Sequence, residues 1–167
     1  MKISCTARIC VILLICGQGA QAQAQFNKRE VQTLLDLTDR LLKARQDLID
    51  LSESSARAQG AMNTYSCVRE LYHELVLASD RVSFSIDLLT INTKMANDQD
   101  KKIVNEVIFR NSVFDLYNLE ESRRNINRLV GSCSTSPAVA NYARMSLSLV
   151  SEAERSFSSI NNRLPRP

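Results

Sequence analysis

Glu70 and His73 are the residues whose types and spacing come closest to a catalytic or metal-binding motif. They form a Glu-x-x-His pair, which di-iron helical bundles use to direct a carboxylate and an imidazole at a metal site. Such a site needs two copies of the pair, and His73 is the single histidine of the chain. On a helical wheel both residues point away from the apolar stripe of Val68, Leu71 and Leu75. We therefore interpret them as surface residues and predict no metal site.

The chain also lacks the residues that haem, zinc, nucleophilic or phosphate-binding sites need. Haem attachment needs a Cys-x-x-Cys-His motif, which is absent, and zinc would need more cysteine and histidine ligands. Serines are plentiful, but a serine nucleophile needs a histidine base beside it and a strand-turn-helix elbow. A glycine loop that cradles phosphate is missing, because two of the four glycines lie in the first 20 residues. The sequence predicts that the chain is not an enzyme and binds no cofactor.

The first 24 residues have the pattern of a cleaved signal peptide. A short basic start precedes the apolar run ICVILLIC at 9–16, which is too short to span a bilayer. Ala-x-Ala motifs favour cleavage after Ala22 or Ala24. A lipoprotein alternative would modify Cys16, but the residue before it is not small. We predict a signal peptide at 1–24 and a periplasmic or secreted mature chain, and the AQAQAQ region is more typical of a bacterial protein.

The mature chain has an ordinary size and a balanced charge. Cleavage after Ala24 leaves 143 of the 167 residues, which is enough for one domain with a real core. It removes Lys2 and Arg8 and no acid, so the net charge falls from +3 to near +1. The charges are interleaved, and no later apolar run is long enough to cross a bilayer. These features predict neither a nucleic-acid partner nor a stable membrane anchor.

Residues 34–51 (LLDLTDRLLKARQDLIDL) repeat in rows of seven, and each row opens on an apolar pair. Because seven residues are about two helical turns, the pairs stack on one side of a long amphipathic helix. Asn27 and Glu30 have the spacing of a capping box at its start, and the helix is expected to end near Ala58, before Gly60. The pairs expected to be buried are Leu34/Leu35, Leu41/Leu42 and Leu48/Ile49.

Three further helices follow in the sequence. The second is expected from about Thr64 to 95–97, and a turn at 97–100 supplies the cap of the third helix, at about 100–130. Gly131 is predicted to stop that third helix. Ser136 before Pro137 is predicted to begin a fourth helix that ends near Asn161, and the tail at 164–167 is expected to be disordered.

Periodicity also assigns a buried face to each of these helices. The second helix should bury Cys67, Val68, Leu71, Leu75, Ala78, Val82, Ile86 and Leu89. The third has a broad apolar face of Ile103, Val107, Phe114 and Tyr117, with Phe109, Val113 and Leu116 beside them. The fourth should bury Tyr142, Met145, Leu149, Ala153, Phe157 and Ile160.

Four helices joined by short loops predict an all-α fold, an antiparallel up-down-up-down four-helix bundle, as a single domain at 25–163. Cys67 and Cys133 are the two cysteines left after cleavage, and exported chains commonly pair them. Both lie at one end of such a bundle, and their bond would stabilise it by ~3–4 kcal/mol. Two separate buried thiols are the alternative.

One surface of the second helix is apolar without belonging to its buried stripe, and the broad apolar face at the start of the third helix lies beside it. We therefore expect excess apolar surface at the end of the bundle away from the disulfide. Two explanations fit it: neighbouring helices or the termini cover it, or it binds another protein or a second copy of the chain. We predict an exported, non-enzymatic protein that mediates protein–protein interaction, as an adaptor, inhibitor or secretion accessory. The alternatives are a cofactor- or metal-binding bundle and a self-assembling structural component of the envelope. The candidate partner-binding residues are Leu77, Phe84, Leu88, Ile91 and Met95.

Overall fold

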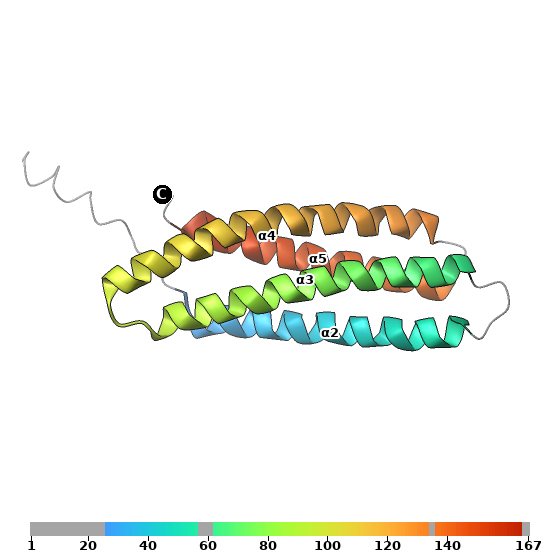
Figure 1. The fold of residues 1–167 in the computed structure, drawn as a ribbon, viewed down its shortest axis with the longest axis horizontal. Helices are drawn as coiled ribbons and strands as arrows, with labels where there is room; N and C mark the ends of the chain where they lie inside the picture. The colour runs from blue at the N-terminus through green and yellow to red at the C-terminus, as the bar shows by residue number, and fades with distance from the viewer. Residues whose placement is uncertain (1–25, 57–61, 134–135, 165–167) are drawn as a thin grey trace, which may run out of the picture.

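The computed structural model describes residues 26–56, 62–133 and 136–164. The predicted signal peptide, the Gly60 turn and the last three residues lie outside these ranges. Within them the chain forms four helices and no strand. Figure 1 shows that successive helices run in opposite directions and lie side by side, which is the predicted up-down-up-down bundle. The helices are α2 (Lys28–Ala56), α3 (Met62–Lys94), α4 (Asp98–Ser132) and α5 (Pro137–Arg163).

The predicted helix starts are present. Asn27 and Glu30 form a reciprocal capping box at α2: the Glu30 backbone N–H donates to Asn27 Oδ1 (3.0 Å), and the Asn27 N–H donates to Glu30 Oε2 (2.9 Å). Asn97 caps α4, because its Oδ1 accepts from the Gln99 backbone N–H at 2.8 Å. Pro137 occupies the first turn of α5, after Ser136, whose side chain makes no capping hydrogen bond.

Two predicted ends are wrong. Gly131 does not stop α4, which continues through Ser132, and its backbone does not adopt the left-handed conformation of a glycine stop. The helix ends at Cys133, which is buried and whose N–H donates to the Leu129 carbonyl at 2.8 Å. The extra residues carry the cysteine to its partner on α3. Leu164, which we placed in the disordered tail, is buried in the core, so the ordered domain includes it.

The Cys67–Cys133 disulfide is present and joins the start of α3 to the end of α4, with Cα atoms 5.9 Å apart. The two residues are 66 positions apart in the sequence, yet an antiparallel pair of helices places them at one end of the bundle. The covalent link and the topology therefore agree. The alternative of two separate thiols is wrong.

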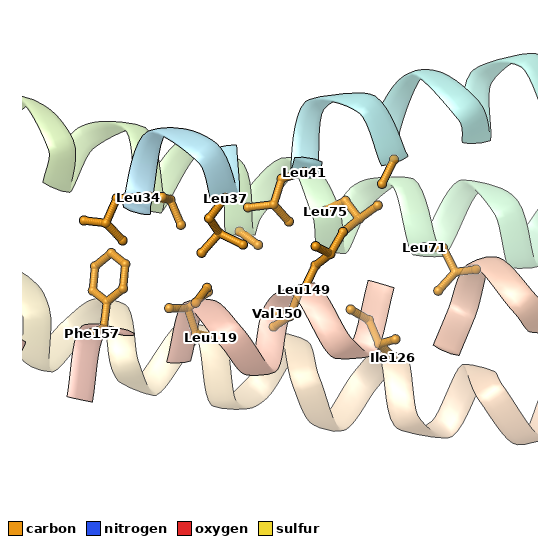
Figure 2. Packing of buried hydrophobic residues seen from close by; sticks show 14 of the residues in the cluster. Leu34, Leu37, Leu41, Leu71, Leu75, Leu119, Ile126, Leu149, Val150 and Phe157 are labelled. Carbon is orange, nitrogen blue, oxygen red and sulfur yellow. The ribbon is translucent and has the colours of Figure 1, made fainter. Parts of the chain in front are cut away.

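The core is an apolar column between the helices, to which all four contribute leucine, isoleucine, valine or phenylalanine (Figure 2). The predicted stripe of α3 is buried, with Cys67 half-buried. On α2 only the first residue of each apolar pair is buried, because Leu37 and Ala44 fill the other inward positions. Adjacent residues differ by about 100° around a helix, so the second member of each pair faces outward. The exposed members are Leu35, Leu42 and Ile49.

The broad apolar face predicted for α4 is not the face that the helix buries. Ile103, Val107, Val113, Phe114 and Tyr117 are all exposed, and Phe109 and Leu116 are half-buried. The helix is rotated because polar side chains on its other face bond to α3 and α5 inside the bundle. The face that is buried holds Asn105, Ile108, Ser112, Asp115, Leu119, Ser122, Ile126 and Leu129.

The predicted buried face of α5 is largely correct. Leu149, Ala153, Phe157 and Ile160 are buried, and Tyr142 is half-buried against the core. Met145 is exposed, contrary to the prediction, because it lies at the edge of the apolar stripe and Ser146 takes the inward position beside it.

Candidate functional site

The outer side of α3 carries a second apolar row in addition to its core stripe. The five predicted partner-binding residues follow one another at spacings of seven, four, three and four along it, which is the pattern of a helix-packing seam. Phe84 is 50% exposed, Ile91 is 47% exposed, and Leu77 is exposed as well. Leu88 and Met95 are half-buried, and Leu88 packs against the edge of the core. The neighbouring helices therefore leave most of this row in contact with solvent.

The outer side of α4 carries a matching row. Ile103, Val107 and Phe114 are exposed, and they follow the same spacing of four and seven residues. The Arg81 guanidinium of α3 lies 4.9 Å from the centre of the Phe114 ring, so this row faces the α3 side. Sequence analysis placed excess apolar surface at the adjoining ends of α3 and α4 but proposed partner-binding residues on α3 alone.

Polar contacts set the register between α3 and α4. Asn92 Nδ2 donates to Asn105 Oδ1 at 2.8 Å near one end, and both residues are buried. Asn125 Nδ2 donates to a carboxylate oxygen of Glu74 at 2.8 Å near the other end. Residues of α3 and α4 that lie about the same number of positions from Gln99, beside their shared loop, are therefore level with each other, as expected of antiparallel helices.

This register brings the two rows together on one face of the bundle. Phe84 lies level with Phe114, Ile91 with Val107, and Met95 with Ile103. All of them point to the same side, away from the core, at the end of the bundle that lies far from the disulfide. We define the apolar α3–α4 face as Phe84, Leu88, Ile91, Met95, Ile103, Val107 and Phe114.

The other half of the same side, next to the disulfide, is polar. An open cleft there is lined by Glu70, His73, Glu74 and Arg128, among other residues. Glu70 and His73 are exposed, as predicted, whereas Glu74 is buried and only one of its two carboxylate oxygens has a protein partner. Within the described ranges, no three His, Cys, Asp or Glu side chains converge closely enough to hold a metal ion.

Asp115 is the charged side chain that α4 buries against α3, with 3% of the side chain exposed. Its carboxylate accepts hydrogen bonds from Arg81 (3.3 Å) and from Ser85 Oγ (3.4 Å). Burial raises the pKa of the Asp115 carboxyl, and this effect outweighs the Arg81 charge and the two hydrogen bonds, which lower it. The folded chain therefore binds this proton more tightly than the unfolded chain does.

Replacing Asp115→Asn is expected to remove a pH-dependent loss of stability. In the parent chain, protonated Asp115 favours the fold fully below about pH 4, and this contribution disappears as the pH rises through the raised pKa. At pH 7 the variant should be more stable than the parent chain, because a neutral side chain avoids the cost of burying the charge. Urea unfolding between pH 3 and pH 7 measures the difference. Asp39→Asn, at an exposed position on α2, controls for the loss of one negative charge, and a parallel pH dependence in all three proteins would contradict the assignment.

The inward polar residues of α4 were the signal that sequence reasoning overlooked. Asn105, Ser112, Asp115 and Ser122 are spaced like a helix-packing seam, although a hydrophobicity pattern ignores them. Three of the four take part in hydrogen bonds to α3 or α5. A search for polar residues in seam positions would have suggested the observed rotation of the helix.

No known family model matches this chain, and no curated protein and no solved structure is significantly similar to it. None of the helices in the described ranges is both long and apolar enough to cross a membrane. The architecture defines an antiparallel four-helix bundle with one disulfide.

Proposed function

We propose that this chain is an exported, non-enzymatic protein that works by binding another protein chain through the apolar α3–α4 face. The observation that carries the proposal is the orientation of α4, which buries four polar side chains beside four apolar ones while it exposes Ile103, Val107 and Phe114. Such an arrangement costs stability and solubility in an isolated bundle. Contiguous exposed apolar surface typically marks an interaction site.

The composition of this face supports the same proposal. It combines two aromatic rings with branched aliphatic side chains and Met95, and aromatic residues and methionine are enriched where proteins associate. Arg81 stacks on Phe114 at its edge, and its charge is already balanced by Asp115. A partner that covers the face would therefore not have to neutralise this arginine.

Export is supported by the disulfide, because such bonds persist in oxidising compartments such as the periplasm or the extracellular medium. Mass spectrometry of the protein recovered from its native organism tests this part. We expect a mature chain that begins at Gln23 or Gln25, with Cys67 and Cys133 resistant to alkylation until a reductant is added. An intact chain that begins at Met1 would contradict the proposed export.

Phe84→Glu tests the binding face directly. Phe84 is half exposed, so the introduced charge should leave helicity and thermal stability nearly unchanged. It should abolish capture of the partner by lowering the affinity at least a hundredfold. Leu88→Glu should also reduce binding, but it destabilises the fold too because Leu88 packs against the core edge.

The matched control is Leu42→Glu, which places the same charge at an exposed leucine on α2. The immobilised mature chain and both variants are incubated with an extract of the native organism that also contains the untagged chain. A protein retained by the parent and by Leu42→Glu but lost by Phe84→Glu supports the proposal. Equal capture by all three chains, or unfolding of Phe84→Glu, refutes it.

A further inference from the structure

We propose that the partner at the apolar α3–α4 face is a second copy of this chain. The two copies pack face to face about a two-fold axis parallel to the helices, so that α3 of each copy lies along α4 of the other. This inference rests on the proposed function, because it uses the same face, and it adds the identity and orientation of the occupant.

The apolar residues of the face are complementary to themselves in this arrangement. A two-fold axis parallel to the helices places α3 of one copy opposite α4 of the other. Each residue keeps its height along the axis in both copies. Phe84 of one copy then meets Phe114 of the other, and Ile91 meets Val107. In such an isologous interface each contact occurs twice, so the same apolar patch is removed from water on both copies.

The charges around the face are complementary in the same arrangement. Glu70 and Asp87 lie on the outer side of α3, and Arg110 and Arg128 lie on the outer side of α4. The register places Asp87 level with Arg110, and Glu70 level with Arg128. Each acid of one copy therefore lies beside an arginine of the other, and Arg110, which bonds Glu106 within its own chain, is exposed enough to reach a second acid.

The alternative two-fold axis, perpendicular to the helices, is disfavoured by the same charges. It would pack α3 on α3 and α4 on α4 of the second copy, about the middle of the apolar face. Asp87 would then lie near Asp87 of the other copy, and Arg110 near Arg110. Like charges at close range oppose association, so the charge pattern favours the axis parallel to the helices.

The polar contacts inside the bundle make the face a suitable interface. Asn92 with Asn105, and Arg81 with Asp115, hold α3 and α4 at a fixed register below the face. The two apolar rows are therefore held in their relative positions before association. Preorganised surfaces lose less conformational entropy when they bind.

The experiment measures the solution mass of the oxidised mature chain by light scattering and analytical ultracentrifugation over a wide concentration range. We expect a dimer that Phe84→Glu weakens at least a hundredfold and Leu42→Glu leaves unchanged. Ile103→Glu, at an exposed position of α4, should act like Phe84→Glu and provides a second independent variant. Circular dichroism confirms that each variant remains folded.

Two charge reversals test the orientation. Asp87→Arg and Arg110→Asp should each weaken the dimer roughly tenfold, because each creates two like-charged pairs across the interface. An equimolar mixture of the two variants should recover the affinity, since the mixed dimer contains only opposite pairs. With the perpendicular axis, neither reversal alone would weaken association, so unchanged dimers of both variants overturn the proposed orientation.

A chain that stays monomeric at all concentrations overturns the second copy as the partner. If that monomer still captures a different protein from the native extract, and Phe84→Glu abolishes the capture, the proposed function remains while this inference fails. If the monomer captures nothing, both fail. A dimer that Leu42→Glu disrupts and Phe84→Glu does not would place self-association on the outer side of α2 and also refute this inference.

Discussion

Phe157→Ala is expected to lower the free energy of unfolding by about 3–5 kcal/mol, whereas Phe114→Ala should lower it by at most about 1 kcal/mol. The Phe157 side chain of α5 is 0% exposed, and its ring lies beside Leu34 of α2 in the core (Figure 2). Removing it leaves a cavity that the surrounding leucines cannot fill. Phe114 is 54% exposed and loses mainly its contact with Arg81.

The comparison of these two phenylalanines tests which face of α4 is buried. Sequence periodicity placed both rings on apolar helix faces, which a bundle is expected to bury, so it predicts two large effects, whereas the structure predicts one. Urea unfolding followed by circular dichroism measures both variants, at a concentration low enough to keep the chain monomeric. Similar large losses for the two variants would show that α4 is rotated as the sequence suggested.

Loss of the Cys67–Cys133 disulfide should lower the free energy of unfolding by about 3–4 kcal/mol, the second largest effect we expect. The bond joins positions 66 residues apart, so without it the unfolded chain gains much conformational freedom. The helices should still form, because the leucine-rich core does not depend on the bond. Double replacement Cys67→Ala with Cys133→Ala gives the chain that lacks the bond.

The reduced parent chain is the matched control for the disulfide. It keeps both sulfur atoms in the packed end of the bundle, where Cys133 is buried, and so separates loop entropy from the loss of side-chain contacts. In urea unfolding, adding reductant to the parent chain should cause most of the expected loss in the free energy of unfolding. The double alanine variant should lose slightly more. Equal stability of the oxidised and reduced chains would contradict a stabilising bond.

Much of the bundle follows from local patterns. The α3 stripe from Val68 to Leu89 has an unbroken helical period, and such a stripe needs partner helices. The capping residues Asn27 and Asn97 mark helix starts because their side chains bond nearby backbone N–H groups. These features depend on residues within one or two turns, so they can be identified without knowledge of the fold.

The position of the apolar row on α3 was also predictable, because Leu77, Phe84 and Ile91 recur every seven residues away from the core stripe. Its exposure was not predictable, since a row of this kind is equally suited to a neighbouring helix. That α4 leaves the row uncovered depends on contacts between residues far apart in sequence.

The sequence by itself determined four helices, their order and the pairing of the cysteines, because periodicity, capping and chain connectivity are local or topological. The tertiary structure alone decided how α4 is rotated. Hydrophobicity favoured burying Phe114, but Asn105 and Asp115 find hydrogen-bond partners on α3 only when they face inward. Ile103, Val107 and Phe114 of α4 are consequently exposed. Together with the outer row of α3 they form the face through which we expect this protein to associate.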